Sequence, residues 1–162
     1  MTDSPTIHAS AVLIGPKAAL IRGPAGSGKS RLAWDLLQAA ELGALPFTRL
    51  VADDRVHLAV HDGRLLVRPA SALAGLIEIR GLGIRRLAFE PVAAVGLVID
   101  LGAEDAGRHP GAEAGDTGKA GDTGKSGKTG IAGIALPRLA VAGGMQALPL
   151  VLGLLATAAG GD

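Results

Sequence analysis

The segment from Gly23 to Ser30 has the residue types and the spacing of a phosphate-binding loop. It reads Gly23-Pro24-Ala25-Gly26-Ser27-Gly28-Lys29-Ser30 and fits the pattern G-x-x-x-x-G-K-[ST] without a mismatch. Glycines allow consecutive backbone N–H groups to point at phosphate oxygens, and Lys29 places an ammonium group against the β- and γ-phosphates. The hydroxyl of Ser30 is a suitable Mg²⁺ ligand. The sequence therefore predicts a nucleotide site in which these residues contact the phosphates.

Two other segments carry ionisable side chains where a strand is expected to end. Asp53 and Asp54 follow an apolar strand at 49–52, so that one carboxylate would hold Mg²⁺ while the other accepts a proton from an attacking hydroxyl. The pair also fits a turn before the next strand. Glu78 and Arg80 share one face of a strand by alternation, which favours a metal or phosphate site over a core position.

The elements that position these residues follow from hydrophobic periodicity and turn residues. The loop lies between an apolar strand and an amphipathic helix, which is the setting that phosphate binding requires. Gly43 is the expected stop of that helix. We expect strands at 7–14, 18–22 and 49–52, and the helix at 29–42.

The segments 56–61 and 64–68 are expected to form a β-hairpin. Asp62-Gly63 between them is a favoured two-residue turn, and it sets the register. In that register one face packs on the core through Leu58, Val60, Leu65 and Val67. The other face carries His57, His61, Arg64 and Arg68 and is expected to meet water or a partner.

The second half of the chain changes in composition. We expect strands at 76–80 and 95–101, followed by a flexible low-complexity insertion over 102–130, in which Gly-Asp-Thr-Gly-Lys occurs twice. Order is expected to return at 131–141 and in a closing helix that begins near Met145. We interpret residues 1–162 as a single domain.

Composition and charge narrow the class of protein. Of the 162 residues, 48% are hydrophobic, and 16 Lys and Arg against 15 Asp and Glu leave a net charge of +1. This balance argues against nucleic acid or an anionic membrane as partner. Cysteine is absent, which excludes disulfides and thiolate chemistry.

The N-terminus shows no secretory signal, and the apolar residues 139–159 are more typical of a buried helix than of a membrane span. We therefore expect a cytoplasmic domain.

Four motifs, in this order and spacing, resemble the C-terminal catalytic domain of the HPr kinase/phosphorylase family. They are His8-Ala9-Ser10, the phosphate-binding loop, Leu50-Val51-Ala52-Asp53-Asp54 and Glu78-Ile79-Arg80-Gly81-Leu82-Gly83-Ile84. The resemblance implies an α/β fold, a mixed sheet similar to that of phosphoenolpyruvate carboxykinase, with a P-loop helix and a C-terminal helix. It implies ATP- and Mg²⁺-dependent phosphorylation of a serine of the phosphocarrier protein HPr, and removal of that phosphate by inorganic phosphate.

Roles for individual residues follow from the same resemblance. His8 matches an active-site histidine that contacts the transferred phosphate, and Lys29 matches the loop lysine. Ser30 and Glu78 match the two Mg²⁺ ligands. Arg108 is our candidate for an arginine that contacts phosphate.

The acidic pair and the signature segment are assigned in the same way. One of Asp53 and Asp54 matches the general base that acts on the target serine, and we favour Asp53. The signature segment further contributes the motif residues Arg80, Gly81 and Gly83.

The sequence also departs from the family pattern. The chain resembles a short form that lacks the N-terminal domain, and residues 136–139 stand where a Gly-Arg-Asn segment linked to dephosphorylation is expected. The phosphorylase activity is therefore the weaker part of the expectation. A hexamer is implied by resemblance alone. The alternatives are a small-molecule P-loop kinase and a nucleotide-binding sensor without catalysis.

Overall fold

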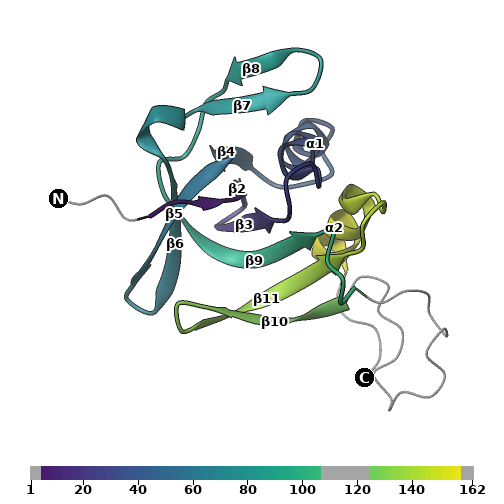
Figure 1. Ribbon diagram of the computed structural model, residues 1–162. Coiled ribbons are helices and arrows are strands. Elements are labelled where there is room, and N and C mark those ends of the chain that lie inside the picture. Colours follow the sequence, from purple (N-terminus) through teal and green to yellow (C-terminus); the bar gives the residue numbers. More distant parts are fainter. Residues whose placement is uncertain (1–4, 107–124, 158–162) are drawn as a thin grey trace.

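The computed structural model describes residues 5–106 and 125–157, which form a mixed α/β fold with a large sheet and two α-helices (Figure 1). The helices are α1 (Lys29–Glu41) and α2 (Ala147–Ala156), with a 3₁₀ turn η1 (Ser71–Leu73). The strands are β1 (Ile7–His8), β2 (Ser10–Ile14), β3 (Lys17–Arg22), β4 (Thr48–Ala52), β5 (Arg55–His61), β6 (Arg64–Pro69), β7 (Leu76–Ile79), β8 (Gly83–Arg86), β9 (Ala93–Leu101), β10 (Lys125–Ile131) and β11 (Ile134–Val141). The predicted mixed sheet with a helix after the glycine-rich loop and a C-terminal helix is confirmed.

Strand β9 is the centre of the large sheet. It runs parallel to β3 and, along residues 98–101, parallel to β11, while its first residues pair antiparallel with β6. Strand β2 pairs antiparallel with both β3 and β4. The strands β4, β3, β9 and β11 therefore all point the same way, and their carboxyl ends meet at one edge of the sheet. Residues that follow these strands are brought together there.

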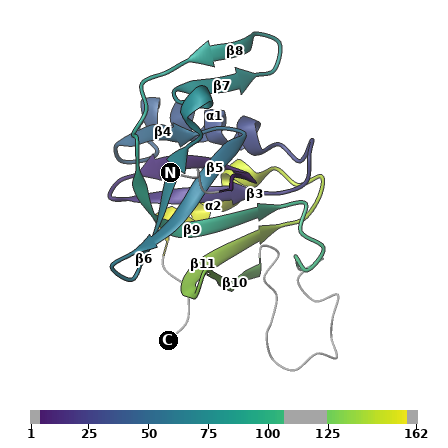
Figure 2. The same cartoon turned by 60° about the vertical axis from the view of Figure 1, so that its left-hand side comes forward.

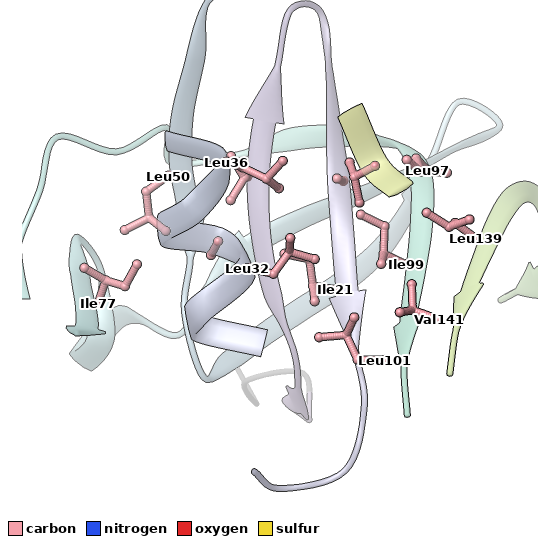
Figure 3. Packing of buried hydrophobic residues seen from close by; sticks show 14 residues of the cluster. Ile21, Leu32, Leu36, Leu50, Ile77, Leu97, Ile99, Leu101, Leu139 and Val141 are labelled. Carbon is pink, nitrogen blue, oxygen red and sulfur yellow. The ribbon is translucent and has the colours of Figure 1, made fainter. Parts of the chain in front are cut away.

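Two apolar layers hold the sheet. On one face, α1 buries Leu32 and Leu36 against a cluster that includes Leu50, Ile21 and Ile99 (Figure 3). The 3.6-residue period of α1 places these leucines on one side of the helix, as the sequence predicts. On the other face, the β5–β6 hairpin closes over small and branched residues of the central strands. Together the layers fix α1, and with it the loop that precedes it, against the sheet.

The β5–β6 hairpin has the predicted register, since Val60 pairs with Leu65 and His57 with Arg68. The prediction that His57 lies on an exposed face is wrong. The His57 side chain is only 6% exposed, and its Nδ1 atom has no hydrogen-bond partner within the described part of the chain. Alternation sets which face a residue lies on, but burial depends on what packs against that face.

Other boundaries also differ from expectation. The strand expected at 7–14 is broken at Ala9, because β1 pairs with β5 whereas β2 pairs with β3 and β4. Strand β7 is joined by β8 in a separate two-stranded sheet, which projects from the rest of the molecule (Figures 1 and 2). Residues 83–86 have no hydrophobic alternation that distinguishes a strand from a loop.

The end of the low-complexity segment is a strand rather than the expected flexible loop. Residues 125–131 form β10, which pairs with β11 through backbone hydrogen bonds. Backbone pairing needs no apolar side chain, which explains how a segment without hydrophobic periodicity joins the sheet. Residues 107–124 lie outside the described part of the chain.

The closing helix α2 is less buried than expected. Val151 is its only fully buried residue, and Leu155 is 43% exposed. Helix α2 contacts α1 near the ends of β9 and β11 (Figure 1). Among the described residues, no helix has the length and apolar character needed to cross a membrane.

Candidate functional site

The glycine-rich loop (Gly23–Gly28) connects the end of β3 to the first residue of α1, as the motif requires. Gly28 has a left-handed backbone (φ 98°) directly before Lys29, the first helical residue. The ammonium group of Lys29 folds back over the loop and donates hydrogen bonds to the carbonyl oxygens of Gly23 (2.9 Å) and Pro24 (3.2 Å). The helix amino terminus and Lys29 thus lie where they would both attract an anion.

Gly23 is the position in this loop where a side chain has no room. A Cβ atom there would lie 2.5 Å from Ser27 Oγ and 2.9 Å from the backbone oxygen of Leu101. The Gly23→Ala variant is expected to lose about 2 kcal/mol of unfolding free energy, because the backbone of β9 or of the loop must shift. Urea unfolding followed by circular dichroism measures this loss.

Gly26→Ala is the matched control for that variant. A Cβ at Gly26 meets nothing within 4 Å, although its φ of 78° is unfavourable for alanine. We expect a cost of about 1 kcal/mol from the backbone conformation alone. Equal losses in the two variants would show that the contact with β9 does not matter.

Asp53 is the buried centre of the site. Its side chain is 4% exposed, and its Oδ1 accepts hydrogen bonds from Ser10 Oγ (2.6 Å) and Ser30 Oγ (2.8 Å). Its Oδ2 accepts from the backbone N–H of Glu78 (3.1 Å). One carboxylate therefore connects β2, α1 and β7 at the end of β4.

Asp54, the next residue, is placed in the opposite way. Its backbone is left-handed (φ 72°), which turns the side chain away from the core. The carboxylate is 65% exposed and lies 3.7 Å from Nδ1 of His8, itself 63% exposed. The backbone N–H of Ala9 donates to the carbonyl oxygen of Asp54 (3.1 Å), which fixes the two segments side by side. His8 and Asp54 therefore form an accessible acid–imidazole pair beside the buried Asp53.

The residues expected to bind Mg²⁺ offer oxygen ligands without a preformed cage. The described residues contain no cluster of three or more His, Asp or Glu side chains that would hold a metal ion. The Ser30 hydroxyl is anchored by Asp53, and Glu78 is exposed on β7 directly beside that carboxylate. A hydroxyl, carboxylates and nucleotide phosphates are the set that Mg²⁺ uses in nucleotide sites, so these residues fit the ion.

A pocket of about 710 Å³ opens beside the glycine-rich loop. It is bounded by residues 24–28, by the first turns of α1, by the end of β9 and by residues 141–149. Leu101, Val141 and Met145 give it apolar surface, and the loop gives it backbone polar groups. Its size is that of a small-ligand site, large enough for the nucleoside part of a nucleotide.

An ion-pair cluster that the sequence analysis did not single out lies at the same edge of the sheet. Asp100 of β9 accepts two hydrogen bonds from Arg22 (2.7 and 2.8 Å) and one from Arg138 (2.5 Å). Burial would raise the pKa of Asp100, but the hydrogen bonds and charges of Arg22 and Arg138 outweigh it and hold the pKa below its ordinary value. The sequence feature that could have indicated this cluster is Asp100 itself, a charged residue within the apolar strand β9.

The structure brings most of the expected site residues together and leaves others apart. His8, the loop with Lys29 and Ser30, Asp53, Asp54 and Glu78 come from five different elements or connections and meet at the carboxyl edge of the sheet. Arg80 and Gly81 lie in the exposed turn between β7 and β8, and Gly83 is the exposed first residue of β8. Arg108 lies outside the described residues. Ser10 was missed as a site residue, although it stands in the His8-Ala9-Ser10 motif.

Comparisons of sequence match the first part of the chain to a known family. Residues 1–89, more than half of the chain, match the family model described as the HPr Serine kinase C-terminal domain. The chain is 39% identical over 85 residues to HPr kinase/phosphorylase of Streptococcus thermophilus, and 36% identical over 78 residues to that of Clostridium beijerinckii. These alignments cover 52% and 48% of this chain but only 25% and 24% of those proteins.

Comparison of structures covers nearly the whole chain. The Hpr(Ser) kinase/phosphatase from Coxiella burnetii superimposes with a TM-score of 0.70 at 25% sequence identity. The match covers 94% of this chain and 95% of that one, so it extends well beyond residue 89. With the site motifs in place, the family match and the shared fold lead to one conclusion: this chain belongs to the family of HPr serine kinase C-terminal domains.

Proposed function

We propose that the chain is an ATP-dependent kinase domain that phosphorylates a serine of HPr. The observation that carries the proposal is the pairing of two carboxylates with different environments beside a phosphate-binding loop. Asp53 is buried and bonded to Ser30, while Asp54 is exposed next to His8. Phosphoryl transfer to a hydroxyl uses a metal-ligating group that is held in place and a second group that takes the proton. Asp53, which fixes the Ser30 hydroxyl, and the exposed Asp54 are placed for these two roles.

The loop and Lys29 would hold the phosphates of ATP. Backbone N–H groups at the start of α1 would face the phosphates, and the Lys29 ammonium group would add a positive charge. Such groups stabilise the charge that develops on the transferred phosphoryl group. The pocket beside the loop would take the nucleoside, which leaves the side facing His8 and Asp54 open to the acceptor.

We propose Asp54, rather than Asp53, as the general base. In the reaction, the serine oxygen forms a bond to the γ-phosphorus, the bond from that phosphorus to the bridging oxygen of ADP breaks, and the serine proton passes to an Asp54 oxygen. Both Asp53 oxygens already accept hydrogen bonds, and the side chain is buried, whereas Asp54 is accessible to a protein substrate. His8 lies within reach to orient Asp54 and to contact the phosphoryl group.

Ser30 and Glu78 would hold Mg²⁺ together with the phosphates. When bound, Mg²⁺ supplies charge neutralisation at the β- and γ-phosphate oxygens. Asp53 contributes through Ser30, whose hydroxyl it fixes in one orientation, and through the backbone of Glu78. These contacts explain why an aspartate is buried at this point.

The first test is transfer of phosphate from ATP to HPr in the presence of Mg²⁺, read by the intact mass of HPr. Wild-type protein is expected to add one phosphoryl group to a serine. Lys29→Ala is expected to slow the transfer at least about a hundredfold, because a charge that stabilises the transferring group is lost.

The control for this test is Lys17→Ala, a change of the same type on β3, at the opposite end of that strand from the loop. It is expected to leave the rate unchanged. Unmodified HPr despite ATP binding would contradict the protein-kinase proposal and favour a small-molecule kinase or a sensor. Phosphate transfer to a small-molecule acceptor, but not to HPr, would favour the small-molecule kinase over the sensor.

The relatives' names add a second activity, phosphate-dependent removal of the phosphoryl group. We propose it for this chain because the same groups would serve the reverse attack by inorganic phosphate. Incubating phosphorylated HPr with inorganic phosphate and measuring its mass tests it. A likeness to phosphoenolpyruvate carboxykinase around the nucleotide, contact of Arg108 with phosphate and a hexameric assembly stay predictions.

A further inference from the structure

The Asp100 ion-pair cluster (Arg22, Asp100, Asp105 and Arg138) joins the three neighbouring parallel strands β3, β9 and β11. Arg22 of β3 forms a two-point pair with Asp100 of β9, and Arg138 of β11 bonds to the same carboxylate. Arg138 also forms a two-point pair with Asp105 (2.7 and 3.0 Å). The Asp100 side chain is 14% exposed and that of Arg138 is 18% exposed. The contacts to Asp100 therefore differ from a surface ion pair, which water and salt would weaken, whereas the Arg138–Asp105 pair is exposed.

The cluster lies directly against the glycine-rich loop. Arg22 is the residue before Gly23, whose carbonyl oxygen accepts the hydrogen bond of Lys29. The start of the loop rests on the end of β9, since a Cβ at Gly23 would meet Leu101 and a Cβ at Gly102 would lie 3.5 Å from Pro24. The same end of β9 therefore touches the loop through its backbone and holds Arg22 through Asp100.

Stability alone does not explain a cluster of this kind. The rest of β9 is apolar, and burying charges costs solvation energy that apolar residues of similar size would avoid. Two-point pairs between arginine and carboxylate do, however, fix direction as well as distance. The sequence thus places directional contacts at the point where the loop leaves the sheet.

We propose that Asp100 is a positioning residue for the phosphate-binding loop, acting through Arg22. By fixing the last residue of β3, it holds the backbone N–H groups of residues 24–28 in one arrangement before an anion arrives. Arg138 holds Asp100 from the other side and ties the 102–105 turn to it. The expected effect of Asp100 on ATP affinity rests on the proposed function, whereas its expected effect on the order of the loop backbone does not.

The test compares backbone motion in the nucleotide-free protein by ¹⁵N relaxation. In wild-type protein the order parameters of residues 24–28 are expected near about 0.85, and in Asp100→Asn below about 0.6. Glu90→Gln is the matched control. Glu90 forms an ion pair with Arg49 (3.1 Å), which is also an arginine–carboxylate pair, but this pair lies near the amino-terminal ends of β4 and β9. It is expected to leave the loop unchanged. Loss of order in both variants, or in neither, would overturn the proposal.

Arg22 variants separate the positioning role from general damage to the fold. Arg22→Gln is expected to loosen the loop as Asp100→Asn does, whereas Arg22→Lys, which keeps the charge, is expected to restore much of the order. These variants also decide the matter if Asp100→Asn does not fold. If Gln and Lys at position 22 give the same order parameters as wild type, Asp100 does not act through Arg22.

Titration of the same samples with ATP and Mg²⁺ links the loop to function. Asp100→Asn is expected to raise the Kd for ATP about tenfold, the size of a typical coupling between sites. A loosened loop with an unchanged Kd would overturn the claim that positioning supports nucleotide binding. Failure of wild-type protein to bind ATP would instead contradict the proposed function, while the relaxation data would still decide the role of Asp100.

Discussion

Replacing Asp54 with asparagine is expected to lower the rate of phosphoryl transfer to HPr by a factor of about 10² to 10⁴, the range that a general base contributes. The Kd for ATP is expected to stay unchanged, because Asp54 does not contact the loop or Ser30. Asparagine tolerates the left-handed backbone at this position (φ 72°), so the variant removes the basic oxygen without straining the chain. Initial rates at saturating ATP, read by the mass of HPr, measure the effect.

Asp62→Asn is a close control for Asp54→Asn. Asp62 also has a left-handed backbone (φ 50°), is exposed, and lies 3.4 Å from a histidine, His61. It stands in the turn of the β5–β6 hairpin, outside the site. Its variant is expected to keep the wild-type rate. If Asp54→Asn keeps at least half of the wild-type rate, Asp54 is not the base.

Replacing Asp53 with alanine is expected to lower the free energy of unfolding by about 3 kcal/mol. The change leaves the buried Ser10 Oγ and the part-buried Ser30 Oγ and Glu78 backbone N–H without their acceptor, and each unpaired buried donor costs about 1–3 kcal/mol. Since the two hydroxyls can rotate to other partners, the total falls below the sum. Urea unfolding measures the loss, and ATP titration is expected to show weaker binding as well.

Asp35→Ala provides the comparison for that loss. Asp35 accepts from Arg31 at 3.3 Å on the exposed side of α1, an i,i+4 pair whose loss is expected to cost no more than about 0.5 kcal/mol. The Ser10→Ala and Asp53→Ala double variant adds a second check, because removal of both partners is expected to cost less than the two single losses together. Additive losses would mean that Ser10 and Asp53 do not interact.

Local patterns were enough to predict the parts of the site that are continuous in the chain. The glycine-rich loop, the helix after it and the hairpin around Asp62-Gly63 each depend on backbone conformations that a few neighbouring residues determine. The order and spacing of the motifs also predicted the family, because they follow the order in which the strands carry the functional residues. These features needed no knowledge of long-range packing.

Long-range contacts decided the features that the sequence analysis missed. Asp53 and Asp54 are adjacent and identical in type, so no local pattern distinguishes them. Their difference arises because Ser10 and Ser30, distant in sequence, surround one carboxylate while the backbone turn at Asp54 exposes the other. The burial of His57 has a related reason. Alternation predicts the face of the hairpin on which His57 lies, but it does not predict what packs against that face.

The sequence by itself determined the chemistry that is available here: a loop for phosphate, a lysine, two carboxylates and a histidine, in an order typical of one family. Only the tertiary structure decided which of these groups are buried and which are exposed. The parallel course of β4, β3, β9 and β11 brings Asp53, the loop and Asp100 to one edge. Burial and hydrogen bonding then give each charged group its role, because they depend on neighbours that are far apart in the chain.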